Sequence, residues 1–368
     1  GGFVPRNSPK PKDMCVNADE SEPGTCKDRL LIENDPMQLI EGMMIGALAV
    51  GAKKGYIYIR GEYRYLIEIM DKAIAEARAA GWLGTNIQGT GFDFDCYTHS
   101  GAGAYECGEE SALLESLEGK RGVPRIRPPF PAVAGLYRCP TVLNNVETYC
   151  AVPSILRMGG EAWASLGTPR NGGTRLFCLS GHVNKPGVYE LPMGFNLLKM
   201  IEEVGGGIRG GKKLKAVIPG GSSCPILTAN ECDIAMDFDA LKAANSMLGS
   251  GGVVVMDETT DMVKVALRIM KFYQHESCGW CIPCREGTLW LKKILTRVYE
   301  GMGQNNDPAL LHELANNMLG RTFCPLGDAA AMPTIAIVEK FRDEFDAYVR
   351  RSPMANLADV ETEVPVSA

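Results

Sequence analysis

Four cysteines near the carboxyl end of this 368-residue chain constrain its fold more than any other feature. Cys278, Cys281 and Cys284 follow one another at intervals of three, and Cys324 lies further along in Thr322–Gly327. A C-x2-C-x2-C triplet bends around one corner of a cubane, and a distant cysteine supplies the fourth thiolate. The chain must then fold so that the two segments meet. The tight triplet favours a [4Fe–4S] over a [2Fe–2S] cluster.

Zinc is the main alternative for these thiolates. Structural zinc usually takes two C-x2-C-like pairs, and the second pair is missing here. His275 stands next to the triplet, and the preceding helix end would have to unwind for it to complete a Cys3His site. A chain without metal is the third reading. If a cluster binds, we expect Arg285 to donate hydrogen bonds that adjust its potential.

The remaining cysteines show no ligand spacing, and we expect them to be small buried hydrophobes. They are Cys15, Cys26, Cys96, Cys107, Cys139, Cys150, Cys178, Cys224 and Cys232. An odd total of 13, with scattered spacing and no leader visible before Gly1, does not indicate a disulfide framework. A reducing, cytoplasmic compartment is therefore expected.

Size and charge exclude several classes of protein. The length suggests two or three domains. The net charge of -6 argues against a nucleic-acid-binding protein. The longest uncharged apolar stretch, Gly42–Ala52, is shorter than the roughly 20 residues that a membrane-spanning helix needs, so no membrane span is expected.

The amino-terminal part of the chain alternates between strand and helix patterns. Strands are predicted over residues 13–17, 55–60 and 92–98, and helices over 36–50, 66–80, up to 117, and 141–158. This alternation predicts an α/β unit with a largely parallel sheet.

Two loops of this unit follow predicted strands, where α/β sheets bind ligands. Asn17–Gly24 offers an amide and three carboxylates to the rim of a heterocycle, and Ser100–Glu110 has small residues that let the backbone approach a flat ring. Together they predict a flavin or nucleotide site. A solvated acidic turn and a plain turn into a helix are the alternatives.

Two further segments are candidates for ligand contacts. The long Pro-, Arg- and Gly-rich connection over 119–140 contains Arg127–Phe130, which presents either a cation and an aromatic face or a simple rim contact. Asn144–Thr148 starts a predicted helix and suits either a phosphate or ordinary N-capping.

Beyond residue 170 the pattern changes twice. Strands at 174–181 and 187–192, a helix at 196–204 and a strand from Lys213 suggest a small β-grasp module. The segment Gly220–Pro225 is most simply a turn. Helices are then predicted over 262–275, 285–300, 308–319 and 329–350, with Pro333 kinking or delaying the last.

Taken together, these motifs resemble the NADH-binding flavoprotein (F) subunit of NADH:quinone oxidoreductase, respiratory complex I. The matching segments run in the family's order over nearly the whole chain: Asn17–Arg29, Ser100–Glu110, Pro128–Pro131, Asn144–Thr148, Pro186–Glu190, Glu276–Arg285 and Phe323–Gly327.

The resemblance implies bound FMN, a [4Fe–4S] cluster and NAD(H) as substrate. It implies an α/β fold class with a Rossmann-like FMN/NADH-binding domain over 1–170. A ubiquitin-like β-grasp domain over 171–251 and a four-helix bundle with the cluster site over 252–351 follow, and then a tail over 352–368.

The resemblance also assigns residues to each group. The flavin would meet Gly2, Asn17, Asp19, Tyr105, Gly108, Glu109 and Glu110, with Asn144, Asn145 and Thr148 at its phosphate and ribityl end. NADH would contact Phe3, Glu22, Tyr105 and Phe130, and the cluster ligands would be Cys278, Cys281, Cys284 and Cys324. The carboxylates of Asp19, Glu20, Glu22, Glu109 and Glu110 would surround the site with negative charge. Glu22 or Glu106 would repel a 2′-phosphate and so favour NADH over NADPH.

By this resemblance, NADH passes a hydride directly to FMN, no side-chain base is needed, and electrons leave singly through the cluster towards quinone. Expected partners are a [2Fe–2S] thioredoxin-like subunit and a larger iron–sulfur subunit, in a peripheral arm on the cytoplasmic, inner face of the membrane. The diaphorase subunit of an NAD-linked hydrogenase or formate dehydrogenase is the alternative enzyme, and a zinc-stabilised binding scaffold is the alternative without redox activity.

The sequence departs from the family pattern at several points. Phe3 runs directly into Val4, where the family continues with a segment that contains a lysine and an aromatic residue, and the family's amino-terminal part is absent. Glu106 replaces a usual apolar residue, and Arg127 stands where a lysine is common.

Overall fold

The computed structural model describes residues 2–5 and 7–355, which form two compact units. The first contains residues up to Ser21, Thr25–Leu176 and Glu190–Met193. The second contains Glu22–Gly24, Phe177–Tyr189 and the described residues from Gly194 onward. The predicted tail lies outside the described residues from position 356.

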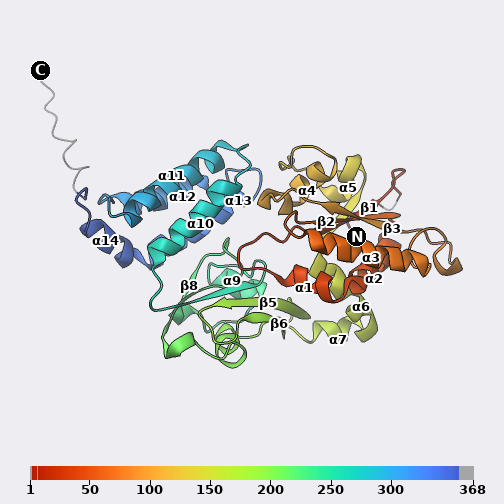
Figure 1. Ribbon diagram of the computed structural model, residues 1–368, viewed down its shortest axis with the longest axis horizontal. Coiled ribbons are helices and arrows are strands. Elements are labelled where there is room, and N and C mark those ends of the chain that lie inside the picture. Colours follow the sequence, from red (N-terminus) through yellow and green to blue (C-terminus); the bar gives the residue numbers. More distant parts are fainter. Residues whose placement is uncertain (1, 6, 356–368) are drawn as a thin grey trace, which may run out of the picture. The chain divides into compact units, whose positions relative to one another are not determined.

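A four-stranded sheet in the order β3-β2-β1-β4 forms the centre of the first unit (Figure 1). Its strands are β1 (Asp13–Ala18), β2 (Lys54–Ile59), β3 (Asp95–Ser100) and β4 (Thr141–Asn145). Every neighbouring pair is parallel, with Asp13 opposite both Lys54 and Thr141. The prediction of a parallel α/β sheet is therefore confirmed.

Helices cover both faces of this sheet, since side chains along a strand alternate between its faces. The helices are α1 (Lys27–Asn34), α2 (Pro36–Val50), α3 (Arg64–Ala79), α4 (Glu110–Leu117), α5 (Pro131–Ala134), α6 (Val146–Met158) and α7 (Gly160–Ala164). On one face Met14 and Val16 pack with residues of α2, α3 and α6. On the other, Cys15 packs with leucines of α4, and Figure 1 shows α4 and α2 on opposite sides of the strands.

Local signals explain where α2 begins and ends. Asp35 accepts a hydrogen bond from the Gln38 amide at 3.0 Å, and Pro36 occupies the first turn, where its missing N–H costs nothing. The helix ends at Gly51, which adopts a φ of 75° that a side chain would disfavour.

The predicted helix over 141–158 is wrong in its first residues. Thr141–Asn145 forms strand β4 alongside β1, and α6 begins only at Val146. Thr141 and Val142 are β-branched and pair well in a sheet, and the side chain of Asn145 caps the helix by accepting from the Glu147 amide.

A five-stranded mixed sheet lies in the second unit, in the order β6-β5-β9-β7-β8. Its strands are β5 (Thr174–Gly181), β6 (Gly187–Pro192), β7 (Leu214–Ile218), β8 (Leu227–Thr228) and β9 (Gly252–Asp257). Strand β9 pairs parallel with β5 and antiparallel with β7. Helix α8 (Leu197–Lys199) continues as a π-helical turn to Val204, and α9 (Phe238–Ala243) precedes β9.

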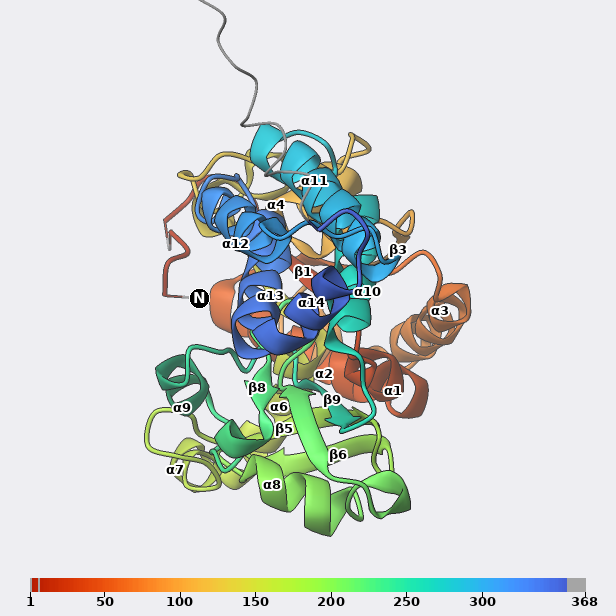
Figure 2. The ribbon, with the colours of Figure 1, turned by 90° about the vertical axis from the view of Figure 1, so that its left-hand side faces the viewer.

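Five helices complete the described chain: α10 (Met262–Glu276), α11 (Ile282–Tyr299), α12 (Asp307–Met318), α13 (Leu326–Lys340) and α14 (Arg342–Arg350). Figure 2 shows α11, α12 and α13 side by side, and each contacts the next. The single helix predicted over 329–350 is in fact two, because the backbone leaves helical geometry at Phe341, whereas Pro333 lies inside α13. Within the described residues, no helix is long and apolar enough to cross a membrane.

Candidate functional site

The carboxyl ends of all four strands in the first unit lie at one edge of the sheet, since the strands are parallel. The acidic turn follows β1, the glycine loop follows β3, and α6 begins directly after β4. The segments singled out in the sequence thus emerge at the edge where α/β sheets bind ligands.

Hydrogen bonds connect these three segments. The Asn17 amide nitrogen Nδ2 donates to the carbonyl oxygen of Gly108 at 2.7 Å, which links the acidic turn to the glycine loop. The Asn145 Nδ2 donates to the Asn17 carbonyl oxygen at 3.3 Å. In the turn, Asp19 accepts from the Ser21 hydroxyl at 2.9 Å. Asn17 therefore fixes the relative positions of the loops after β1 and β3.

The glycine loop ends in two glutamates that face a single arginine. Glu109 caps α4: its Oε2 accepts from the amides of Ser111 and Ala112, at 2.9 and 3.0 Å. Its other oxygen, Oε1, is buried and accepts no hydrogen bond from the described residues. The nearest cation is Arg127, whose Nη2 forms an ion pair with Oε1 at 3.5 Å. Arg127 also donates to Glu110 at 2.6 Å. The Pro-rich connection thus brings a cation to the acidic site.

A buried lysine organises the other side of this edge. The Lys27 side chain is 4% exposed, and its Nζ lies 2.7 Å from Asp28, 2.9 Å from Glu147 and 2.9 Å from the Asn145 Oδ1. Burial disfavours the charged ammonium, but the two carboxylates more than offset this and raise the pKa of Lys27. Asn145 also donates to Asp28 at 2.7 Å, so one network fixes its orientation.

Glu20 is the acidic residue of the turn whose protonation is most perturbed. Its two oxygens accept the amides of Asp28 and Arg29, at 2.8 and 3.1 Å. Burial, reinforced by the charge of Asp28, raises the pKa of Glu20 to about 7 despite these hydrogen bonds. Glu20 therefore titrates near neutral pH.

The structure brings some predicted site residues to this edge and leaves others apart. Tyr105 lies in the glycine loop, Asn144 lies near the end of β4, and Thr148 is exposed in the first turn of α6. Phe3 is 89% exposed and Phe130 is 56% exposed. A side chain on Gly2 would meet nothing within 4 Å.

Two acidic residues have settings that their sequence context did not indicate. Glu106 is buried in the glycine loop at 4% exposure. Glu22 belongs to the second unit, where it accepts from the Ser223 amide at 2.8 Å.

The residues at the edge of the sheet fit the chemistry of FMN. A flavin ring and its ribityl chain present N–H and O–H donors, for which the buried Glu109 Oε1 is an acceptor that forms no hydrogen bond among the described residues. Gly108 lies beside the acidic turn, since a Cβ there would be in ordinary van der Waals contact with Asp19 at 3.5 Å.

The four cysteines predicted as cluster ligands lie in two segments of the second unit that are joined by a hydrogen bond. Cys278 follows α10, Cys281 caps α11, Cys284 lies in its first turn, and Cys324 precedes α13. The Phe323 amide donates to the Cys281 sulfur at 3.5 Å, which joins the two loops. The rings of Trp280 and Phe323 also lie 5.1 Å apart.

This arrangement suits thiolate ligands. Cys281 and Cys284 lie at the amino-terminal end of α11, and Cys324 lies just before α13, where backbone N–H groups that are not used within the helix can donate to a ligand. Within residues 2–5 and 7–355, no three His, Cys, Asp or Glu side chains are grouped closely enough to hold a single metal ion. A cubane cluster does not need such a group, because each of its four irons binds a different cysteine thiolate and the four cysteine sulfurs therefore lie at separate corners.

Two neighbours of the triplet have partners of their own. Arg285 donates to the Gly279 carbonyl oxygen at 2.8 Å and pairs with Glu286, so its guanidinium stabilises the cysteine loop. The His275 side chain is 83% exposed and pairs with Glu276, which is not the setting of a buried ligand.

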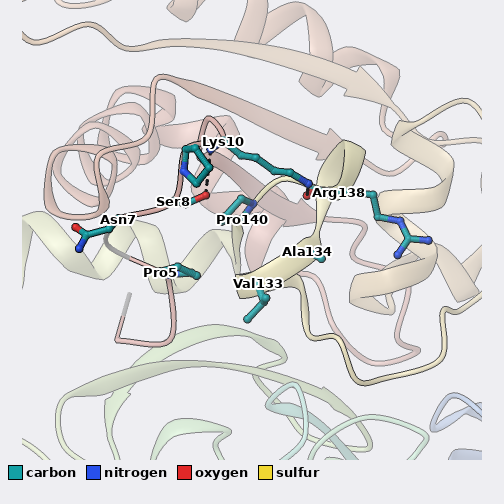
Figure 3. A pocket seen from close by; sticks show the side chains of 9 residues that line it. Pro5, Asn7, Ser8, Lys10, Val133, Ala134, Arg138 and Pro140 are labelled. Atoms are coloured by element: carbon teal, nitrogen blue, oxygen red, sulfur yellow. Dashed lines mark hydrogen bonds between the residues drawn. The ribbon is translucent and has the colours of Figure 1, made fainter.

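A separate pocket of about 610 Å³ opens on the first unit (Figure 3). Its lining comprises Pro5, Asn7, Ser8, Pro9, Lys10, Val133, Ala134, Arg138 and Pro140. Lys10 Nζ donates to the Arg138 carbonyl oxygen at its rim, at 2.9 Å. None of the predicted site residues lines this pocket.

Comparison with known proteins assigns both halves of the chain. Residues 3–154 match the Nuo51 FMN-binding domain, residues 175–265 match the SLBB domain, and residues 264–348 match the NADH-ubiquinone oxidoreductase-F iron-sulfur binding region. The protein is thus a flavoprotein with an FMN-binding domain and a region for a [4Fe–4S] cluster.

Relatives with curated names define the family more narrowly. The chain is 55% identical over 353 residues to the F 2 subunit of NADH-quinone oxidoreductase from Rhizobium meliloti, covering 95% of this chain and 84% of the relative. It is 50% identical to the F subunit of NADH-quinone oxidoreductase from Rickettsia typhi, covering 96% and 84%. The chain therefore belongs to the family of NADH-quinone oxidoreductase F subunits.

Its fold also matches a solved structure of another enzyme. A chain of an NAD+-reducing [NiFe]-hydrogenase in the H2-reduced state superposes with a TM-score of 0.83 and 37% identity. The match covers 93% of this chain and 57% of the hydrogenase chain. The predicted membership of the F-subunit family is confirmed, and the fold is shared with a chain of an NAD+-reducing hydrogenase.

Sequence reasoning missed the residues that hold the site together. Lys27 carries no signal of its own, because lysines are rarely buried. The Gly220–Pro225 segment has the composition of a plain turn, although Ser223 holds Glu22. The position of Lys27 inside the family segment Asn17–Arg29 is the one sequence signal that could have identified it. Ser222 and Ser223 lie outside every segment that resembles the family, so no such signal exists for them.

Proposed function

We propose that this chain oxidises NADH at an FMN site on the strand-end edge of the first unit and delivers the electrons to a [4Fe–4S] cluster held by Cys278, Cys281, Cys284 and Cys324. When bound, FMN accepts a hydride from NADH and releases electrons one at a time. The protein positions the reactants and sets the charge around them. The observation that carries the proposal is that the loops after β1 and β3 and the start of α6 meet at one edge, where Asn17 is bonded to both Gly108 and Asn145.

The residues around this edge take distinct parts. Asn17, Asp19, Tyr105, Gly108, Glu109, Glu110 and Gly2 contact the flavin, and Asn144, Asn145 and Thr148 hold its ribityl and phosphate end. The carboxylates disfavour an anionic reduced ring and so lower the flavin potential, and Glu20 adds to this effect as it ionises near pH 7. Arg127 offsets part of this charge at Glu109 and Glu110.

The nucleotide substrate has its own contacts in this proposal. NADH meets Phe3, Tyr105, Phe130 and Glu22. The exposed rings of Phe3 and Phe130 suit stacking on a nucleotide base. The carboxylate of Glu22 or Glu106 repels the 2′-phosphate of NADPH.

We assign residues 1–170 to the FMN/NADH-binding domain, 171–251 to a β-grasp domain and 252–351 to a four-helix cluster domain. The parallel pairing of β5 with β9 and the antiparallel pairing of β7 with β9 support the β-grasp assignment. Helices α10 to α13, each in contact with the next, support the bundle.

The electrons leave through neighbouring subunits in this proposal. We assign a thioredoxin-like [2Fe–2S] subunit and a larger iron–sulfur subunit as partners, in a peripheral arm on the cytoplasmic face of the membrane, and quinone is reached indirectly. The hydrogenase match favours a second reading, in which the chain is the diaphorase subunit of an NAD-linked hydrogenase. The subunits that co-purify with the chain distinguish the two readings: hydrogenase subunits would replace the first with the second.

Binding of FMN to an Asn17→Ala variant tests the flavin site. Loss of the Asn17–Gly108 hydrogen bond and of a flavin contact should weaken FMN binding about tenfold. Asn34→Ala is the matched control, since Asn34 is exposed on α1 and bonds locally to the Leu30 carbonyl oxygen. Equal FMN affinity in the two variants, by fluorescence titration, would remove Asn17 from the site.

A further inference from the structure

The carboxylate of Glu22 is bonded by the Gly220–Pro225 turn, which has no part in the proposed reaction. Glu22 Oε1 accepts from the Ser223 amide at 2.8 Å and from the Ser222 hydroxyl at 3.4 Å. The Ser222 amide in turn donates to the Pro23 carbonyl oxygen at 3.2 Å. Side chain and backbone of the acidic turn are thus both bound to the same two serines.

The glycines of this turn make the contact possible. A Cβ on Gly221 would lie 2.5 Å from the Glu22 Cγ, and Gly221 has a φ of +98°. A Cβ on Gly220 would lie 2.1 Å from the Leu248 carbonyl oxygen. Any side chain at Gly221 would push Glu22 away, so the Gly-Gly-Ser-Ser sequence is shaped around this carboxylate.

A buried tyrosine fixes the serine that bonds Glu22. The Ser222 hydroxyl lies 2.9 Å from the Tyr273 hydroxyl, and these residues are 5% and 0% exposed. The Ser222 hydroxyl has one hydrogen, which it donates to Glu22, so the Tyr273 hydroxyl donates to Ser222. The hydroxyl pair therefore has one consistent direction, which ends at Glu22.

Tyr273 lies in the last turn of α10, next to the cysteine segment. Its carbonyl oxygen accepts from the Ser277 amide at 3.1 Å. The Ser277 hydroxyl is 3.2 Å from the Cys284 sulfur and accepts from the Gly279 amide at 3.3 Å. One helix end thus anchors both the turn under Glu22 and the loop of the cluster cysteines.

We propose that Ser222, Ser223 and Tyr273 are positioning residues that hold the Glu22 carboxylate in place for the nucleotide, which makes the SLBB region part of the specificity device of the enzyme. The inference rests on the proposed function in one respect, that Glu22 meets NADH. Without the hydroxyl pair, Glu22 keeps the hydrogen bond from the Ser223 amide but loses the second donor that fixes the position of its carboxylate. The loss should appear in nucleotide affinity and in discrimination against NADPH, with kcat little changed.

The test uses the holoenzyme with its flavin and cluster, reduced beforehand so that NADH is not turned over. Calorimetry then gives the Kd for NADH in wild type, Ser222→Ala, Tyr273→Phe and Glu22→Gln. Ser222→Ala removes the hydroxyl that donates to Glu22, and Tyr273→Phe removes the hydroxyl that donates to Ser222; each change should raise the Kd about fivefold. Glu22→Gln should raise it at least as much, and Tyr273→Phe should add nothing in that background.

Tyr348→Phe is the matched control, since it removes a phenol hydroxyl that bonds Asp261 on a different part of the helical region. Its Kd should equal that of wild type, and flavin and iron contents should be unchanged in all variants. Steady-state KM and kcat with NADH and NADPH provide the second readout.

The outcomes separate the inference from the function on which it rests. If Glu22→Gln weakens NADH binding while Ser222→Ala and Tyr273→Phe match wild type, the positioning role is wrong and the proposed function stands. If Glu22→Gln also binds NADH like wild type, Glu22 is not a nucleotide contact and the inference falls with that assignment. Failure of wild type to bind both NADH and flavin would instead overturn the proposed function.

Discussion

Replacing Lys27 with methionine should destabilise the first unit strongly. Lys27 is the cation of a network that contains Asp28, Glu147 and the Asn145 side chain, all within 2.9 Å of its Nζ. Methionine fills a similar volume but leaves the carboxylates without their partner. Breaking a buried ion pair in this way costs about 3–5 kcal/mol.

The structure places the expected loss near the lower end of that range. Glu147 is 21% exposed, so water partly compensates it, whereas Asp28 is 5% exposed and would remain as an uncompensated buried charge. We therefore expect about 3 kcal/mol, a factor of roughly 150 in the ratio of folded to unfolded protein. With a urea m-value of about 2 kcal/mol/M, the midpoint should fall by about 1.5 M.

Urea unfolding followed by circular dichroism measures this effect. Lys53→Met is the matched control, because its pair with Asp93 is exposed at 72% and 38% and should contribute less than about 1 kcal/mol. Adding Asp28→Asn to Lys27→Met should restore part of the stability by removing the unpaired charge. Equal midpoints for Lys27→Met and Lys53→Met would refute the reasoning.

Three further predictions concern protonation, the cluster and specificity. The pKa of Glu20 is raised to about 7 in the folded protein, so protonated Glu20 stabilises the fold. This stabilisation is complete below pH 4.5, the ordinary pKa of a glutamate, and is lost as the pH rises through 7. Glu20→Gln should remove this pH dependence, which amounts to up to about 3 kcal/mol in the free energy of unfolding. Urea unfolding as a function of pH measures it, and parallel profiles for wild type and the variant would contradict the prediction. Cys324→Ser should abolish or severely reduce the bound iron. Cys178→Ser is the control, since Cys178 is a buried packing cysteine of β5, and it should retain the iron. Iron analysis of both variants tests this, and full iron content in Cys324→Ser would exclude Cys324 as a ligand. Glu106→Gln should increase NADPH oxidation relative to NADH, and steady-state rates showing no gain would remove Glu106 as a specificity determinant.

The sheet of the first unit could be predicted where its strands carry their own signal. The strand at Asp13–Ala18 is a nearly continuous buried run bounded by an acidic turn, so its type and position are evident in the sequence. Strand β4 is not, because Thr141–Asn145 is short and leads directly into a helix that dominates the local pattern. Its strand conformation comes from pairing with β1, which is a tertiary interaction that no local window contains.

The candidate site divides in the same way. Cysteine spacing is a local pattern, so the triplet could be singled out from the sequence, and Cys324 is predicted with it as the fourth ligand. The burial of Lys27 and the support of Glu22 by Ser222 and Ser223 depend on contacts between distant segments. Neither residue type indicates such a role, because lysines are usually exposed and Gly-Gly-Ser-Ser is typical of an ordinary turn.

The most direct test of the account is an anaerobic titration of the purified protein with NADH, with flavin, iron and zinc contents measured on the same sample. The account predicts FMN and iron without stoichiometric zinc. It also predicts that NADH bleaches the flavin absorption band, and that in a rapid-mixing experiment the rate of bleaching falls when the transferred hydrogen of NADH is deuterium. A protein that contains zinc without flavin or iron, or a bound flavin whose absorption NADH leaves unchanged, would contradict it.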